Sequence, residues 1–258
     1  MDIERRFGGI ARLYGQQSLE RFLRSHVAVI GVGGVGSWAV EALVRSGIGV
    51  LTLYDLDHVA ESNVNRQLHA IEDNFGKAKV SALAERVQKI NPQCHVNAVE
   101  QFIEQHTLEM VAGCGFDYVI DCVDNYRIKA ALIAFCRRNK IPVITVGGAG
   151  GQIDPTRIKL ADLSRSEQDP LLAKCRRQLR KEYGFPSNTK RRFDIPCVYS
   201  TEQQRYPDSQ GSVCMDRPSA IESSLNCGGY GSAMTVTASF GLVAVSYVLR
   251  RISEMKAR

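Results

Sequence analysis

Strand-like segments alternate with amphipathic segments in the part of the chain before Gly151. Apolar or alternating runs predict strands at 27–31, 50–54, 95–99, 118–121 and 142–146. Apolar residues at helical spacing predict helices at 35–46, 75–90, 104–112 and 130–138. Strands that alternate with helices need crossover connections, so we expect an α/β fold with a Rossmann-like, doubly wound, mainly parallel sheet.

The pattern is less regular after Gly151 and predicts an irregular C-terminal half. A strand is expected at 153–160, a helix at 171–183 and a mobile basic loop at 185–194. Residues 233–249 are almost continuously apolar, but the run is slightly short for a bilayer and contains several Ser and Thr residues. We therefore expect a helix buried against the sheet there, and no membrane span.

Composition indicates an ordinary globular protein that folds without disulfides. Of the 258 residues, 44% are hydrophobic and 23% are charged, which allows a large core. No two of the eight cysteines have C-x-x-C spacing, so no structural zinc is expected. Residues 1–6 are charged and lack the apolar core of a signal peptide, so we expect a reduced, cytoplasmic protein. The net charge of +6 is compatible with anionic partners.

A glycine-rich turn follows the first predicted strand and opens the first predicted helix. Its fingerprint glycines are Gly31, Gly33, Gly34 and Gly36. Glycine permits a tight turn and a close approach to phosphate, and the helix N-terminus offers unpaired N–H groups. Asp55 ends the next strand, where its carboxylate can accept hydrogen bonds from ribose hydroxyls. The turn predicts a nucleotide site without identifying the nucleotide.

Polar residues beyond Asp55 favour ATP over NAD. They are Asp57, Asn63, Arg66, Gln67 and Lys79. Attack of a carboxylate on the α-phosphorus of ATP builds negative charge there and on the departing pyrophosphate, which Arg66 and Lys79 can neutralise. Asp124 follows another strand, and its carboxylate suits Mg²⁺, which prefers few protein ligands. We therefore predict Arg66, Lys79 and Asp124 as catalytic residues, with ATP and Mg²⁺ as cofactors.

Together these motifs resemble the adenylation domain of the E1-like enzymes, the ThiF-MoeB-HesA superfamily. The resemblance covers residues 6–151. The roles it implies are ribose binding for Asp55, phosphate binding for Asn63, Arg66 and Lys79, and Mg²⁺ binding for Asp124. It also implies an ATP-binding adenylation region at 1–151 and a C-terminal substrate and dimer region at 152–258, packed on the same sheet as one integrated domain.

In one branch of this superfamily the likeness extends over nearly the whole chain. Residues 6–9, 11–15 and 147–155, and the region of Cys227, look like the tRNA threonylcarbamoyladenosine dehydratase family. That family uses ATP to activate the carboxylate of the threonylcarbamoyl group on tRNA adenosine 37, and loss of water then gives the cyclic nucleoside. The resemblance implies this tRNA as substrate, a homodimer, and association with a cysteine desulfurase and its sulfur-acceptor protein.

The resemblance suggests roles for Cys227 and Arg12 that the sequence pattern alone leaves open. Cys227 precedes the last predicted helix and is the leading candidate for a catalytic thiol, because a helix N-terminus lowers the pKa of a thiol. A buried thiol without a catalytic role is equally compatible with the sequence, and ring closure can occur directly on the acyl-adenylate. Arg12 is placed either to reach the ATP of a neighbouring protomer or on the surface as an ordinary charge.

The basic segment 174–192 contains eight Lys or Arg residues and one acid. With a tRNA substrate it predicts phosphate contacts, and we propose Tyr183, Phe185 and Phe193 as stacking partners for bases. Three other functions stay open: adenylation of a ThiS- or MoaD-type sulfur-carrier protein, NAD-dependent oxidoreduction, and nucleotide sensing by a scaffold. The missing C-x-x-C pairs favour the tRNA enzyme over the carrier activator.

Overall fold

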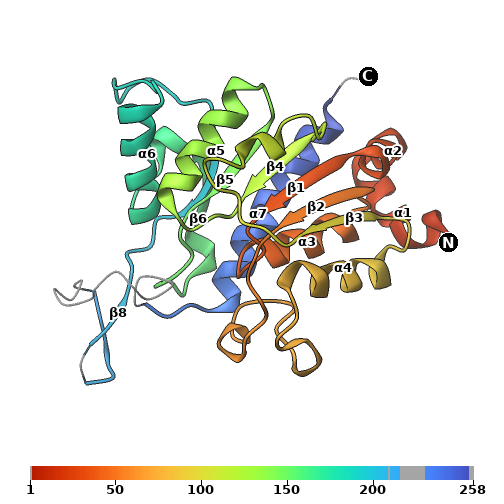
Figure 1. Ribbon diagram of the computed structural model, residues 1–258, viewed down its shortest axis with the longest axis horizontal. Coiled ribbons are helices and arrows are strands. Elements are labelled where there is room, and N and C mark those ends of the chain that lie inside the picture. Colours follow the sequence, from red (N-terminus) through yellow and green to blue (C-terminus); the bar gives the residue numbers. More distant parts are fainter. Residues whose placement is uncertain (1, 209, 216–229, 256–258) are drawn as a thin grey trace.

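The computed structural model describes residues 2–208, 210–215 and 230–255. Within these ranges seven strands form one sheet with the order β3-β2-β1-β4-β5-β7-β6 (Figure 1). They are β1 His26–Ile30, β2 Val50–Tyr54, β3 His95–Val99, β4 Tyr118–Asp121, β5 Val143–Val146, β6 Ile158–Asp162 and β7 Pro196–Ser200. Strand pairs are parallel except β6 with β7, which is antiparallel and leaves β6 at the edge. The predicted doubly wound, mainly parallel sheet is confirmed.

Helices cover both faces of this sheet (Figure 1). They are α1 Ile3–Tyr14, α2 Gln16–Arg24, α3 Gly36–Arg45, α4 Lys79–Ile90, α5 Tyr126–Arg138, α6 Pro170–Glu182 and α7 Met234–Ser253. α3, α4 and α7 bury Leu51 and Ile144 on one face, while α5 and α6 bury Val119 on the other. Two apolar layers explain why the central strands are apolar runs. A hairpin of β8 Tyr206–Pro207 and β9 Val213–Cys214 projects from one side.

The helix predicted at 104–112 is wrong. This segment contains only a 3-10 turn, Leu108–Val111. The Thr107 hydroxyl accepts a hydrogen bond from Glu104 N (2.8 Å), a local contact that competes with helical hydrogen bonding. The apolar positions that suggested helical spacing, among them Leu108, are instead buried against the second face of the sheet.

Other boundaries shift where side chains cap the chain. α5 begins before the predicted position 130 because the Asn125 side chain accepts a hydrogen bond from Arg127 N (3.0 Å). β6 begins later than predicted, after a 3-10 turn at Pro155–Arg157 that Asp154 caps. The sequence pattern does not predict β7, α1 or α2. The errors therefore fall mainly outside the strands that carry the cavity described below.

The apolar C-terminal helix α7 is a core helix. By length and composition it could cross a membrane, but 56% of its most apolar window is buried inside the protein. It packs on α3 and on the face of the sheet formed by β5 and β7. Where α7 crosses α3, a Cβ at Gly241 would stand 2.6 Å from Val35 O, so glycine allows the close approach. Burial accounts for the apolar run at 233–249, as predicted.

Candidate active site

The carboxyl ends of β1, β2 and β4 lie at one edge of the sheet, because the parallel register aligns Ile30 with Tyr54 and Asp121. Loops that follow these strands and β5 surround a cavity of about 720 Å³. Every predicted site residue that the structure describes lines this cavity: Gly31, Gly33, Gly34, Gly36, Asp55, Asp57, Asn63, Arg66, Gln67, Lys79 and Asp124. Cys227 lies outside the described residues. This edge of an open parallel sheet is the usual place for a ligand.

Two positions of the glycine turn between β1 and α3 have no room for a side chain. Gly31 has a φ of 84°, and a Cβ at Gly36 would stand 1.9 Å from Gly31 O. The chain can therefore turn into α3 only with glycine at these positions. Because α3 begins at Gly36 and residues 33–36 line the cavity, the partial positive charge of the helix N-terminus is available to an anion.

Asp55 connects β2 to the glycine turn. It is buried, and its two carboxylate oxygens accept hydrogen bonds from Val32 N (2.8 Å) and Asp57 N (2.9 Å). Burial raises the pKa of Asp55, and the nearby Lys79 ammonium opposes that rise. A carboxylate has lone pairs beyond two hydrogen bonds, so Asp55 can hold the turn and still accept a hydrogen bond from a ribose hydroxyl.

Neighbouring groups hold two cationic side chains of the cavity, Lys79 and Arg66, in place. Lys79 begins α4, and its Nζ lies 2.7 Å from Asp57 Oδ2. The Asp57 side chain is 55% exposed and that of Lys79 only 6%, so the carboxylate can turn to solvent and release the ammonium to another anion. Arg66 Nη1 donates hydrogen bonds to Ser62 O (2.8 Å) and Asn65 Oδ1 (3.0 Å), which keep the guanidinium at the cavity wall.

Asn63 and Gln67 supply amide groups to the same wall. Asn63 Oδ1 accepts a hydrogen bond from Ala60 N (3.1 Å), so this side chain holds its own loop in place. Gln67 is buried, and its Oε1 has no hydrogen-bond partner among the described residues. A buried acceptor without a partner is rare in folded proteins unless water or a ligand completes it. A water molecule or a polar ligand can therefore complete the hydrogen bonding of Gln67.

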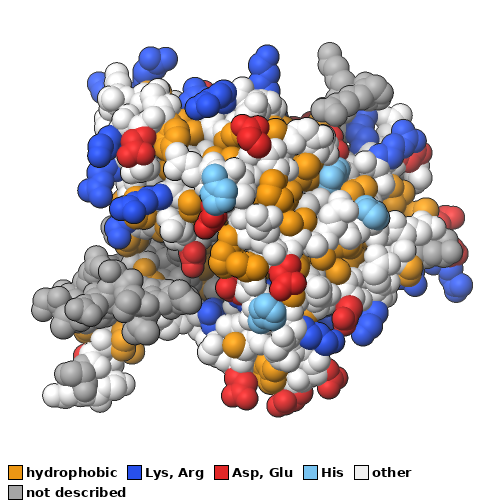
Figure 2. Space-filling model, in the orientation of Figure 1, with side chains coloured by type: hydrophobic (Ala, Val, Ile, Leu, Met, Phe, Trp, Pro, Cys, Tyr) orange, Lys and Arg blue, Asp and Glu red, His pale blue; other side chains and the backbone are white. Residues whose placement is uncertain are grey.

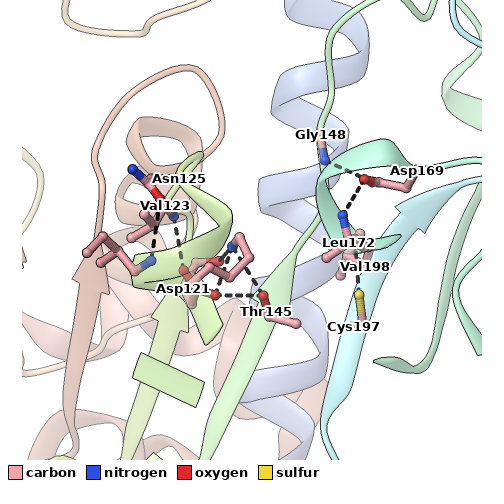
Figure 3. Close-up of polar contacts among 11 residues, drawn as sticks. Asp121, Val123, Asn125, Thr145, Gly148, Asp169, Leu172, Cys197 and Val198 are labelled. Carbon is pink, nitrogen blue, oxygen red and sulfur yellow. Dashed lines mark hydrogen bonds and ion pairs between the residues drawn. The ribbon is translucent and has the colours of Figure 1, made fainter. Parts of the chain in front are cut away.

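Asp124 is exposed and lines the cavity just after β4. The residues on both sides are anchored, because Val123 N donates to Asp121 Oδ1 (3.0 Å) and Asn125 caps α5 (Figure 3). The described residues contain no group of three or more His, Cys, Asp or Glu side chains that could hold a metal ion. Asp124 fits a Mg²⁺ ion that takes one carboxylate and completes its shell with phosphate oxygens and water.

A buried ion pair beneath the cavity is not predicted by the sequence analysis. Lys129 Nζ lies 2.8 Å from Asp121 Oδ2, which also accepts a hydrogen bond from Thr145 Oγ1 (2.6 Å; Figure 3). Burial alone would lower the pKa of Lys129, but the Asp121 charge raises it, so the lysine stays charged. The pair joins β4, α5 and β5 below Asp124. Its signal in the sequence is a lysine within the apolar residues of α5.

Asp169 anchors the glycine run that follows β5. Its carboxylate accepts hydrogen bonds from Gly148 N (2.9 Å) and Leu172 N (2.9 Å), so it caps α6 and ties that helix to the cavity wall (Figure 3). A Cβ at Gly147 would stand 2.0 Å from Asp169 Oδ2, so the contact requires glycine. Burial raises the pKa of Asp169. The only local signal for this contact is the Asp-Pro pair that starts α6.

Some side chains of the basic segment are buried in the core, and others are exposed to solvent. Phe185 and Phe193 are buried and pack edge to face, with ring centroids 5.0 Å apart, so the prediction that they stack on bases is wrong. Both rings belong to the second core, and the Arg180 guanidinium lies 5.1 Å from the Phe193 ring centroid. The basic residues exposed on α6 are Lys174, Arg177 and Lys181. Lys and Arg side chains gather over this helix in Figure 2.

Comparison with known proteins gives a consistent result. The sequence model of the ThiF family matches residues 8–257. The tRNA threonylcarbamoyladenosine dehydratase of Escherichia coli (strain K12) is 50% identical over 255 residues, which cover 98% of this chain and 95% of that protein. Crystal structures of the E. coli dehydratase in complex with ATP and with AMP have TM-scores of 0.86 and 0.87. Each is 48% identical and covers 96% of this chain and 94% of its own.

Proposed function

Because the chain belongs to the ThiF family, and within it to the tRNA threonylcarbamoyladenosine dehydratases, we propose that it catalyses the ATP-dependent dehydration of N6-threonylcarbamoyladenosine at position 37 of tRNA. The observation that carries the proposal is 50% sequence identity, over 98% of this chain, to a dehydratase whose crystal structures contain ATP and AMP. The cavity adds physical support, because it collects the anion-binding and carboxylate groups that adenylation needs.

The first step is binding of ATP at the β1 and β2 end of the cavity. The glycine turn and the α3 N-terminus receive phosphate, and Asp55 accepts hydrogen bonds from the ribose. Arg66 and Lys79 bind the remaining phosphate oxygens, with Asn63 and Gln67 beside them. When phosphate arrives, Lys79 exchanges its contact with the exposed Asp57 for the stronger negative charge of the nucleotide.

The second step is attack of the threonyl carboxylate on the α-phosphorus. A new oxygen–phosphorus bond forms, and the bond to the bridging oxygen breaks to release pyrophosphate. Arg66 and Lys79 stabilise the charge that develops on the phosphates. Asp124 would hold Mg²⁺, which would supply further neutralisation of the departing pyrophosphate. The anchored residues on both sides of Asp124 hold its backbone at the cavity wall.

The third step closes the ring. The neighbouring carbamoyl group attacks the activated carbonyl carbon and loses a proton, and AMP departs with one oxygen of the former carboxylate. Because both groups belong to one nucleoside, the attack is intramolecular and gains from proximity. A preceding transfer to Cys227, with a thioester as intermediate, is the alternative route. A Cys227→Ser variant that retains the wild-type rate would exclude it.

The exposed face of α6 is the part of the basic segment that we assign to tRNA. Lys174, Arg177 and Lys181 recur at spacings of three and four, so they share one face of the helix. Lys174 also lines the cavity, and its Nζ lies 5.8 Å from the Tyr126 ring centroid. The cationic face therefore begins at the cavity mouth, where phosphates on either side of a bound nucleotide would pass.

Further partners belong to the same proposal. In a homodimer Arg12 would reach the ATP of the neighbouring protomer. Arg12 is exposed on α1, which lies at the opposite end of the sheet from the cavity (Figure 1). Within one chain Arg12 therefore cannot reach the nucleotide. The cysteine desulfurase and sulfur-acceptor protein are proposed partners on the strength of the family resemblance, and a cytoplasmic location follows from a tRNA substrate.

The direct test incubates the protein with ATP and tRNA carrying threonylcarbamoyladenosine, then measures AMP and the mass of the released nucleosides. Loss of one water per AMP formed is the expected result. Control reactions contain tRNA with unmodified adenosine, or a ThiS-type carrier protein in place of tRNA. AMP formation that requires the carrier and leaves the nucleoside mass unchanged would overturn the proposal in favour of carrier activation.

A further inference from the structure

The cavity has two ends with different chemistry. The sheet order places the loops after β2, β1, β4 and β5 side by side along its edge. Asp55 and Lys79 line the β2 end, and Asp124 lies in the middle. At the β5 end the wall contains Gly148, Gly150 and the uncharged side chains of Gln204 and Tyr206, and Lys174 of α6 also lines the cavity. The β2 end, with Asp55, Arg66 and Lys79, suits a nucleoside triphosphate, so the β5 end is left for a second, differently built ligand.

Gln204 and Tyr206 are the uncharged polar side chains that distinguish the β5 end. They follow β7 in the chain, line the cavity and are 5% and 8% exposed. The Tyr206 hydroxyl donates a hydrogen bond to Gln204 Oε1 (3.2 Å), and Gln204 Nε2 donates to Gly150 O at 3.5 Å. The second of these contacts is at the limit of a hydrogen bond. A ligand with better geometry can therefore replace it at little loss.

The glycine run opposite these side chains brings backbone close to the ligand space. A Cβ at Gly150 would stand 2.9 Å from the Tyr230 ring, and a Cβ at Gly151 would stand 3.0 Å from Arg205 O. Asp169 holds the start of the run through Gly148 N. The wall is thus fixed by contacts between distant segments.

We propose that the β5 end is the subsite for the threonylcarbamoyl side chain of the acceptor nucleoside, and that Gln204 and Tyr206 determine specificity for it. The proposal rests on the proposed function. This side chain contains a flat urea, with N–H donors and one carbonyl acceptor. The Gln204 amide has the complementary oxygen and N–H groups, and the Tyr206 hydroxyl can donate or accept.

The position of the subsite also satisfies the reaction geometry. With the urea between Gln204 and the glycine run, the threonyl carboxylate points along the sheet edge toward Asp124 and the phosphate-binding end. The carboxylate and the α-phosphorus then meet between the two subsites. An unmodified adenosine lacks the urea, so it would not gain these hydrogen bonds and would bind the subsite more weakly.

The test compares Gln204→Leu with Gln203→Leu, a matched change at the neighbouring exposed glutamine. Steady-state kinetics use tRNA carrying threonylcarbamoyladenosine, and a binding measurement gives the Kd for ATP. Gln204→Leu is expected to raise KM for the tRNA about tenfold through loss of hydrogen bonding, with the Kd for ATP unchanged. Gln203→Leu is expected to match the wild type. Tyr206→Phe, which removes only a hydroxyl, should raise KM in the same direction.

The other outcomes separate this proposal from the function it rests on. If the wild type forms the cyclic nucleoside and both subsite variants keep its KM, the subsite is wrong and the function stands. If Gln204→Leu weakens ATP binding and leaves KM for tRNA unchanged, Gln204 belongs to the nucleotide end and the proposal is again wrong. If the wild type forms no cyclic nucleoside, the function fails and the subsite fails with it. Should Gln204→Leu not fold, Tyr206→Phe decides.

Discussion

The two ends of the cavity differ in how the chain builds them. At the β2 end, short motifs supply the groups, since the glycine turn and Asp55 directly follow neighbouring strands. At the β5 end, contacts join distant segments, such as Gly148 with Asp169 and Gln204 with Gly150. Short sequence motifs therefore supply the groups that bind the nucleotide. The groups that face the second ligand come from distant segments, which meet only in the folded chain.

The largest effect is expected from breaking the buried ion pair that joins β4, α5 and β5. Lys129→Met leaves the Asp121 carboxylate buried without its cation, and should lower the free energy of unfolding by about 3–5 kcal/mol. Chemical denaturation measures it. The double variant Asp121→Asn with Lys129→Met removes both charges and should regain most of the loss. A single variant as stable as the wild type would show that the pair does not hold β4, α5 and β5 together.

Next in size is the loss of a cation from the nucleotide end. Lys79→Ala should slow AMP formation about a hundredfold or more, because the charge developing on the phosphates loses a preorganised partner. Lys77→Ala is the matched control, since Lys77 is exposed and pairs with Glu85 on the surface. Rates of AMP formation at saturating substrate measure both. An almost unchanged rate for Lys79→Ala would refute its catalytic role.

An effect of similar size, on the stability of the fold at low pH, is expected at His69, whose neighbour is Lys79. Burial, and secondarily Lys79, lowers the pKa of His69 to about 4, and both ring nitrogens lack partners among the described residues. Between pH values of about 6.5 and 4 the unfolded state binds more protons, so stability falls as the pH decreases, by up to about 3 kcal/mol. Denaturation of wild type and His69→Leu across this range measures it. Equal slopes would contradict the assignment.

The smallest effect is expected at the basic face of α6, of which only Lys174 lines the cavity. One triple variant replaces Lys174, Arg177 and Lys181 with alanine. Its affinity for tRNA should fall and depend less steeply on salt, with the slope reduced by about one for each lost phosphate contact. A control triple with the same charge change replaces Arg24, Lys77 and Lys89. Equal salt slopes in the two triples would place the tRNA on another surface.

The residues at the nucleotide end of the cavity could be predicted from the sequence, but most of those at the β5 end could not. Gly31, Asp55 and Asp124 follow strands whose apolar runs are easy to recognise, so their meeting at one edge could be predicted. Phe185 and Phe193 were misassigned because a loop that is polar on average can bury its aromatic residues in a core. The burial of Lys129 was not predicted, because a buried charge depends on a partner from another element, here Asp121.

The most direct test of the central claim follows the oxygen atoms of the threonyl carboxylate through the reaction. Threonylcarbamoyladenosine with a heavy oxygen isotope in its threonyl carboxylate is placed in tRNA and turned over with unlabelled ATP. If the carboxylate attacks the α-phosphorus in this cavity, AMP carries one labelled oxygen after ring closure, and pyrophosphate carries none. Label that appears in water or in inorganic phosphate, with none in AMP, would contradict the account.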